Sequence, residues 1–350
     1  MNNLRLRYPG LRPFDAEEQQ SFFGRDKEIE SVCRILDIDK LTILHGPSGM
    51  GKSSLINAGI LPALKAIRQW EIPYHVVPIR FTNYDPELAR IKRERQGLQT
   101  EEVQLIKDPI DRFVEACLGD ASHWETIIPM PKPNLWLSAK KMGIDLGIRP
   151  LRIVFILDQF EELFSYPEER VEEFAQQLGE LFHQNLPESV RKGLERKQII
   201  EAEQEEKALQ LPHPKEAQLM ARIEEPLDVK ILISMRSDKL HYLERLKSFL
   251  PEMMLNSYEL RSFDTKQAKK AITEPASLSR DDFLSPNFTI NEELLDEIIE
   301  FLQDKITQRI DPSQLQIVCQ HIERRMIQRE KKIMKKLNRK KGKSNNPISN

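Results

Sequence analysis

The chain has 350 residues, of which 31% are charged and 39% hydrophobic, and its formal net charge is −2. This length predicts one large α/β domain with a smaller one attached. The longest apolar run, residues 153–157, is too short to span a bilayer, and the N-terminus lacks the apolar core of a signal peptide. Three dispersed cysteines and seven scattered histidines predict neither disulfides nor structural zinc, as in a reducing cytosol. We therefore expect a cytoplasmic protein.

The N-terminal part predicts an irregular lead-in at residues 8–14, a helix towards residue 36 and a strand at residues 41–45. A glycine-rich loop follows, and residues 54–61 indicate the start of a helix. The loop matches G-x-x-x-x-G-K-[ST] with Gly46, Pro47, Ser48, Gly49, Met50, Gly51, Lys52 and Ser53, followed by Ser54. Glycines let successive amides point at phosphate oxygens, and the helix N-terminus adds positive charge. The loop therefore predicts a nucleotide site in which Lys52 meets the β- and γ-phosphates and Ser53 ligates Mg²⁺.

Strands and helices then alternate along the chain. Strands are predicted at residues 75–81, 152–158, 229–235 and 256–260, and helices at residues 103–118, 135–142 and 167–186. Pro78 favours a sheet edge for the first of these strands. The strand at 152–158 is continuously apolar, which indicates burial on both faces. Long crossovers between strands predict a doubly wound parallel sheet.

The C-terminal part is predicted to be helical. Asp264 or Thr265 caps a helix that ends before Pro275, Asn291 caps a second helix, and Ser313 opens the last. We expect a P-loop NTPase domain over residues 1–262 with a charged helical insertion at about 187–228, a helical lid or winged-helix-like domain over 263–337, and a basic disordered tail over 338–350. Residues 324–350 hold eleven Lys or Arg and one acid. A solvated helix end running into this tail is the favoured interpretation, ahead of a nucleic-acid or anionic surface.

Phosphoryl chemistry also needs a carboxylate for Mg²⁺, usually at the end of a neighbouring apolar strand. Asp158 has that place. Glu161 and Glu162 follow it, and both are candidates for the carboxylate that activates water, a choice that the sequence leaves open. Arg236 ends the strand at 229–235 and is predicted to read the γ-phosphate, because the carboxyl ends of parallel strands face the ligand crevice. Asp238 is expected to cap the next helix.

Six segments carry a family resemblance: residues 8–14, 22–25, 46–54, 58–64, 157–164 and 235–238. In this order they resemble the STAND NTPases, regulatory ATPases related to the AAA+ group, and most of all the bacterial novel STAND class one. The resemblance implies an ATP- or ADP-binding core with a helical lid. It implies that Phe23, Gly24 and Arg25 line the adenine pocket, that Arg236 senses the γ-phosphate, and that Pro275 packs on adenine, although Thr273 stands where relatives have glycine.

The predicted function is a regulatory ATPase switch in signalling or defence, in which ATP–Mg²⁺ holds an assembly-competent state and ADP a closed one. Slow ATP hydrolysis would set how long the protein stays in the assembly-competent state before it returns to the closed one. The resemblance implies that the partners are further copies of the chain or a separate sensor or effector protein. A nucleic-acid-linked loader, which the basic C-terminal segment motivates, and an interaction scaffold that ATP only stabilises are the alternatives. Salt-sensitive DNA binding would favour the first, and absence of hydrolysis the second.

Overall fold

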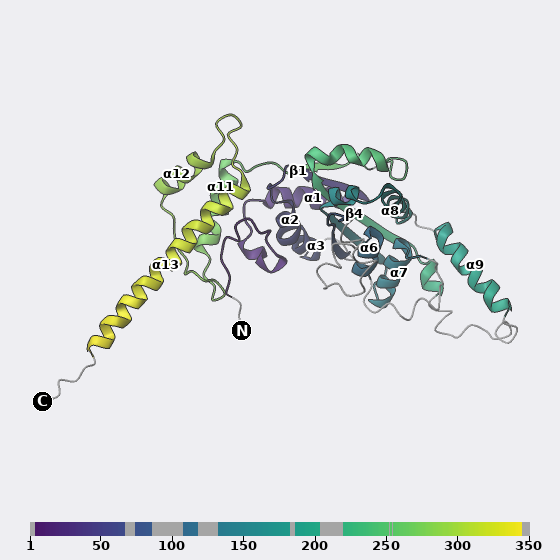
Figure 1. Cartoon of the computed structure of the whole chain (residues 1–350), viewed down its shortest axis with the longest axis horizontal. Coiled ribbons are helices and arrows are strands. Elements are labelled where there is room, and N and C mark those ends of the chain that lie inside the picture. The colour runs from purple at the N-terminus through teal and green to yellow at the C-terminus, as the bar shows by residue number, and fades with distance from the viewer. Residues whose placement is uncertain are drawn as a thin grey trace. The chain divides into compact units, whose positions relative to one another are not determined.

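The structure, a computed structural model, describes residues 4–66, 74–85, 108–117, 132–182, 186–203, 220–251, 253 and 255–344 (Figure 1). Contacts divide the chain into two compact units. The first comprises Met1–Glu30, Pro47–Pro62 and Leu260–Asn350, and the second comprises Ser31–Gly46 and Ala63–Glu259. The first unit thus combines the N-terminal segment and the glycine loop with the C-terminal helices. This grouping differs from the consecutive domains expected from the sequence, whose functional boundaries stay a prediction.

The second unit is built on a five-stranded sheet in the order β2-β3-β4-β1-β5. All neighbouring strands are parallel. The strands are β1 Leu41–Gly46, β2 His75–Arg80, β3 Leu151–Asp158, β4 Leu227–Arg236 and β5 Ser257–Glu259. β2 lies at one edge of the sheet, where Pro78 can be accommodated as predicted. The predicted doubly wound parallel α/β fold is confirmed.

The inner strands β3 and β4 carry the core of this unit. Six of the eight residues of β3 are buried, and only Arg152 and Asp158 are partly exposed. Three helices contribute to the same core: α6 Pro109–Cys117, α7 Leu135–Asp145 and α8 Glu168–Glu180. Burying a large apolar side chain in such a core stabilises the fold by about 1.5–3 kcal/mol. Since neither face of β3 is exposed to solvent, its sequence is almost continuously apolar.

The helices of this unit differ from the expected ranges mainly at their ends. α8 stops at Glu180 rather than near residue 186, and α6 covers only the later part of residues 103–118, whose earlier part lies outside the described residues. The expected charged insertion begins with α9, Glu188–Glu203, and its last two residues belong to β4. Its Pro-containing stretch at 211–214 lies outside the described residues. α1, Asp26–Ile38, ends in this unit, and Lys230 caps it by donating to the carbonyl oxygens of Leu36 and Asp37 at 2.6 and 2.7 Å.

The first unit contains a short helix, η1 Ala16–Ser21, and a continuous helix that begins directly after the glycine loop. That helix consists of α2 Lys52–Ser54, the π-helical turn η2 Leu55–Ile60 and α3 Leu61–Ala66, which runs on into the second unit. Three further helices follow in the C-terminal part: α11 Thr265–Ser277, α12 Glu292–Leu302 and α13 Pro312–Ser344. Their core includes Tyr8, Ile272, Ile299 and Leu315.

The caps of these helices follow the sequence with two corrections. Asp264 and Asn291 cap α11 and α12 as predicted, each accepting a backbone hydrogen bond. α11 does not end before Pro275 but runs to Ser277, because the Tyr8 hydroxyl and the Arg7 guanidinium bond the carbonyl oxygens of Ile272 and Pro275 near that turn. α13 is capped by Asp311 rather than opened by Ser313: the Asp311 carboxylate accepts from the amides of residues 313 and 314 at 2.7 and 3.2 Å.

A buried ionic network fastens the N-terminal segment to the C-terminal helices. Glu323 and Arg7 are both 0% exposed. The Glu323 carboxylate accepts from the backbone amides of Arg7 and Tyr8 and from the Ser285 hydroxyl. The Arg7 guanidinium donates to Ser285 Oγ and to the carbonyl oxygens of Pro275, Leu278 and Ser285. Every charge in the network therefore has partners, which buried charges require.

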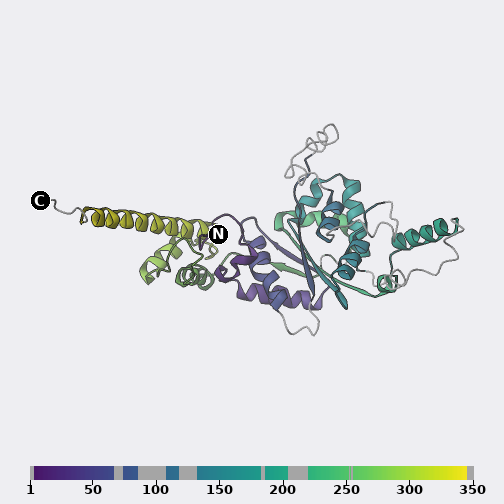
Figure 2. The same cartoon turned by 90° about the horizontal axis from the view of Figure 1, so that it is seen from below.

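The last helix is longer than expected. α13 continues to Ser344, so residues 338–344, which the sequence predicted as part of a disordered tail, are helical, and residues 345–350 lie outside the description. Figures 1 and 2 show its C-terminal end extending past α11 and α12. Within the described ranges, no helix combines the length and the apolar character that a membrane span requires.

Candidate functional site

Two glycines of the glycine loop have left-handed backbone conformations. Gly49 and Gly51 have φ angles of +83° and +85°, a region that favours glycine. Gly51 precedes the helix that starts at Lys52, and no side chain caps this helix start. Lys52 folds back over the loop, with Nζ donating to the Pro47 carbonyl oxygen at 3.0 Å. A helix N-terminus without a side-chain cap, next to a lysine, suits an anion such as a nucleotide phosphate.

Other parts of the first unit hold the loop from three sides. Ser54 Oγ accepts a hydrogen bond from the Phe14 amide at 3.2 Å, and Arg25 donates to the Met50 carbonyl oxygen at 3.2 Å. Ser313, at the start of α13, lies so near Gly49 that a Cβ built there would be 3.0 Å from the serine hydroxyl. The N-terminal segment, the start of α1 and the start of α13 therefore all contact the glycine loop or the helix that follows it.

The carboxyl ends of the strands place the predicted polar residues along one edge of the sheet. In the ladder register, Gly46 at the end of β1 lies opposite Arg236 at the end of β4. Leu157 of β3 lies opposite Ile233 of β4, so Asp158 follows at the same edge. Gly46 is the first residue of the glycine loop, so the loop departs from the edge at which Asp158 and Arg236 end. This is the edge where ligands bind in open α/β sheets.

The two candidate glutamates lie on a 3₁₀ helix, η3 Phe160–Ser165, directly after β3. Phe160 and Leu163 are both 0% exposed, and with three residues per turn they share the face that enters the core. Glu161 and Glu162 occupy the other two faces and are half-buried. Both carboxylates contribute to raising the pKa of Arg236, a smaller effect than that of Asp238. The structure brings both to the strand ends and does not separate their roles.

Arg236 is engaged by a neighbour. Its guanidinium donates two parallel hydrogen bonds to the Asp238 carboxylate, from Nε at 3.0 Å and from NH2 at 2.8 Å. This pairing raises the pKa of Arg236 and lowers that of Asp238. Both side chains are substantially exposed, at 43% and 54%. Bidentate geometry is also how arginine binds phosphate, so Asp238 occupies the fork that a phosphate would use.

The family of the chain is shown by one comparison. A family model described as Novel STAND NTPase 1 matches residues 8–308. The chain belongs to this family. The match includes the glycine loop, the strand ends and helices α11 and α12, and it confirms the resemblance found in the sequence. No curated protein matches the chain.

Three solved structures of other proteins are also similar to this novel STAND NTPase. The Walker-type ATPase PABY2304 of Pyrococcus abyssi is 16% identical, with 95% of this chain and 79% of that chain covered and a TM-score of 0.45. The ORC2 protein of Aeropyrum pernix in its ADP form is 13% identical, with 71% and 51% covered and a TM-score of 0.37. The ORC1 protein of Aeropyrum pernix in complex with DNA is 11% identical, with 87% and 61% covered and a TM-score of 0.39. The chain thus spans about half the length of the ORC2 chain.

The residues assigned to adenine by resemblance have structural partners of their own. A Cβ at Gly24 would lie 2.5 Å from the backbone oxygen of Gln267, so the start of α11 requires a glycine there. Arg25 is 3% exposed, pairs with Glu28 at 2.9 Å and supports the loop at Met50. Pro275 is buried in the last turn of α11. Contact of Phe23, Gly24, Arg25 or Pro275 with a base stays a prediction.

Sequence reasoning missed two groups beside the predicted residues. One is Ser313, which approaches the loop only because α13 folds back on it. The other is Arg80, which ends β2 opposite Asp158 and donates from Nε to Gln159 Oε1 at 2.8 Å. Gln159 has a φ of +57°, a left-handed conformation that few non-glycine residues adopt, and it turns the chain from β3 into η3. Arg80 could have been noticed in the sequence, because it is a polar residue near the end of the predicted strand at 75–81.

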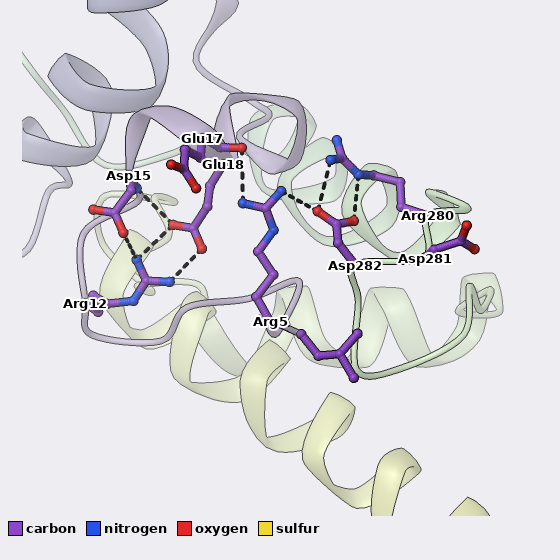
Figure 3. A pocket seen from close by; sticks show the side chains of 9 residues that line it. Arg5, Arg12, Asp15, Glu17, Glu18, Arg280, Asp281 and Asp282 are labelled. Atoms are coloured by element: carbon purple, nitrogen blue, oxygen red, sulfur yellow. Dashed lines mark hydrogen bonds and ion pairs between the residues drawn. The ribbon is translucent and has the colours of Figure 1, made fainter. Parts of the chain in front are cut away.

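A cavity of about 720 Å³ lies in the first unit (Figure 3), and none of the predicted site residues lines it. Most of the charged residues that line it form ion pairs with one another. Arg12 bonds Asp15 and Glu18, while Asp282 accepts from both Arg5 and Arg280. The pair between Arg5 and Asp282 ties the N-terminal segment to the loop at 280–282, so we assign the cavity a structural role.

Proposed function

We propose that this novel STAND NTPase binds ATP with Mg²⁺ and works as a nucleotide-dependent switch. The observation that carries the proposal is the shared sheet edge, where Gly46 opens the glycine loop and where Asp158 and Arg236 end their strands. A phosphate loop, an acid and an arginine at one edge are the groups that phosphoryl chemistry needs.

The chain's own residues have distinct roles in this proposal. The loop amides and Lys52 bind the phosphates, and Ser53 and Asp158 provide oxygen ligands of the kind that Mg²⁺ prefers. When bound, the ion would neutralise negative charge on the phosphates. Glu161 or Glu162 orients water for a slow hydrolysis. The open helix start at Lys52 and the half-buried position of both glutamates support these assignments.

The switch rests on the pair that Arg236 makes with Asp238. A γ-phosphate offers the guanidinium fork a doubly charged partner in place of a solvent-exposed carboxylate, whereas ADP offers none. ATP and ADP therefore favour different partners for the same arginine. Because Arg236 directly precedes the 3₁₀ helix η4, Ser237–Leu246, an exchange of partner acts on the first turn of that helix. A ligand shifts a conformational equilibrium only through such a difference between states.

Calorimetry of Lys52→Ala tests nucleotide binding. Removing the ammonium group should abolish most of the affinity for ATP with Mg²⁺, because it removes the charge that meets the phosphates. Lys65→Ala is the matched control, since Lys65 is an exposed lysine on the same continuous helix. Equal ATP affinity of Lys52→Ala and wild type would refute the assignment.

The two alternative functions have less structural support. A nucleic-acid-linked loader relies on the basic residues after position 323, none of which belongs to the loop or to the strand ends. A scaffold that ATP only stabilises leaves two glutamates and an arginine at the strand ends without a role. We therefore favour the switch, with self-association or a separate sensor or effector as its output.

A further inference from the structure

We propose that the outer face of α12 in one copy of this chain binds the basic end of α13 in a second copy, head to tail. The inference rests on the proposed switch, because it names the surface through which the switch assembles. We call the first surface the acceptor face, formed by Leu294, Glu297, Glu300, Phe301 and Ile306. We call the second the donor end, residues 328–344 of α13.

Three large apolar side chains of the acceptor face are exposed to water. Phe301 is 81% exposed, Ile306 is 92% exposed and Leu294 is 42% exposed. Leu294 and Phe301 are seven residues apart on α12 and therefore share one face. Single exposed apolar residues are ordinary, but two large ones on one face of a helix, with a third in the turn that follows, indicate an interaction surface.

The turn that carries Ile306 is held in place by its own hydrogen bonds. The Asp304 carboxylate accepts from the amides of Ile306 and Thr307 at 3.0 and 2.7 Å. A backbone bridge between Gln303 and Ile310 closes the turn, and a second bridge joins Ile310 to Phe263. The isoleucine is thus presented by an ordered turn, and a partner would meet a surface that needs little rearrangement.

The acceptor face is also acidic. Glu293, Glu297 and Glu300 are exposed along α12. Asp296 pairs with Lys269 at 2.6 Å, whereas neither Glu297 nor Glu300 has an ion-pair partner among the described residues. An apolar centre flanked by unpaired carboxylates favours a partner that is basic and carries an apolar residue of its own.

The donor end fits that description. Residues 328–333 are all exposed, and Ile333 is 52% exposed. Residues 324–344 hold eleven Lys or Arg and a single acid. Several of these cations are spaced four apart, as in Lys331 and Lys335, which destabilises an isolated helix. A projecting helix of this charge is marginal alone and is stabilised by an acidic surface.

A second copy is the occupant that the chain itself suggests. The acidic apolar face and the basic helix belong to the same molecule, yet α13 is a continuous helix whose end extends past α12 in both views (Figures 1 and 2). The donor end therefore cannot fold back onto its own acceptor face while the helix stays intact. Joining different surfaces of two copies gives a head-to-tail contact, which builds rings or filaments.

Two charge reversals of the full-length chain separate the surfaces. Glu297→Lys/Glu300→Lys disables the acceptor face, and Lys331→Glu/Lys332→Glu disables the donor end. Sedimentation velocity with ATP and Mg²⁺ is expected to show association of the wild type that is at least tenfold weaker in either variant. Glu169→Lys/Glu172→Lys on α8, two exposed acids at the same spacing, is the matched control and is expected to associate like the wild type.

Mixing the two variants gives the decisive result. Each retains one intact surface, and the two reversed surfaces are again opposite in charge, so the mixture should regain association, as should a chain carrying both reversals. Phe301→Ser should weaken the contact without any change of charge. A wild type that stays monomeric with ATP, with ADP and without nucleotide would overturn the inference, as would variants that associate normally or a mixture that stays monomeric.

Two further measurements separate the head-to-tail contact from nucleic-acid binding and from the nucleotide switch. If Lys331→Glu/Lys332→Glu loses binding to a DNA duplex while acceptor reversal leaves assembly unchanged, the donor end binds nucleic acid and the inference is wrong. Calorimetry of ATP on the same variants is expected to show wild-type affinity. If Lys52→Ala neither binds ATP nor changes assembly, the head-to-tail contact stands and the nucleotide switch fails.

Discussion

Replacing Gly49 by alanine tests whether the shape of the loop, and not only its charge, holds the phosphates. At a φ of +83° a Cβ costs about 1–2 kcal/mol. The new Cβ would also lie 3.0 Å from Ser313 Oγ. Turning that hydroxyl away gives up its hydrogen bond to the Asp311 carboxylate, about 1 kcal/mol more. Without nucleotide the alanine loop relaxes to relieve this strain, and binding must restore the conformation. The sum of about 2–3 kcal/mol therefore predicts that ATP and ADP affinities fall together, by roughly 30- to 150-fold.

Calorimetry with both nucleotides checks the size and the origin of this loss. Gly49→Ala/Ser313→Ala removes the crowded hydroxyl and should recover the part of the affinity due to it, leaving a loss of roughly 5- to 30-fold. Gly147→Ala is the control: its φ is +68° but no atom lies within 4 Å of the added Cβ, so it should lower stability and leave affinity unchanged. A Gly49→Ala protein that binds both nucleotides like wild type would refute the reasoning.

Glu161→Gln and Glu162→Gln are each expected to keep ATP binding, and the variant that loses hydrolysis in a single-turnover assay identifies the carboxylate that orients water; wild-type rates in both would place that group elsewhere. Arg236→Ala should bind ADP like wild type but lose about 1–3 kcal/mol of preference for ATP. An unchanged ratio of ATP to ADP affinity, measured by calorimetry, contradicts the sensor role. For Lys140, burial lowers the pKa to about 8 in the folded chain. The unfolded chain therefore holds this proton more tightly, so the folded state gains up to about 3 kcal/mol as the pH rises from about 8 to about 10. Urea midpoints of wild type and Lys140→Met should show this gain in wild type alone, and parallel pH profiles would contradict it.

The sheet and the glycine loop could be predicted because they follow from local sequence. β3 is apolar along its length since both of its faces are buried, and the loop pattern specifies both its glycines and its lysine. Asp158 and Arg236 were predictable in the same way, because each ends such a strand and parallel strands end at one edge.

What the sequence did not reveal depends on contacts between distant segments. The helix continues through Pro275 where Tyr8 and Arg7, from the other end of the chain, donate to the carbonyl oxygens of Ile272 and Pro275. Ser313 reaches the loop, and Arg25 turns inward to Met50, only once helices from opposite ends of the chain have packed. No local pattern records such partners. The roles of Glu161 and Glu162 stay open for another reason, since both occupy equivalent positions beside one anchored face of η3.

The bond between the Arg7 amide and Glu323 joins residues that are 316 positions apart, which sets an order for synthesis. At about 5–20 residues per second, a ribosome delivers Glu323 roughly 15–60 s after Arg7. During that interval the N-terminal segment lacks its buried carboxylate, whereas the parallel sheet has all of its strands once residue 259 has been delivered. The nascent chain therefore completes the half that carries Asp158 and Arg236 before the glycine loop gains its last supports. A fragment ending at residue 262 would remain at that stage.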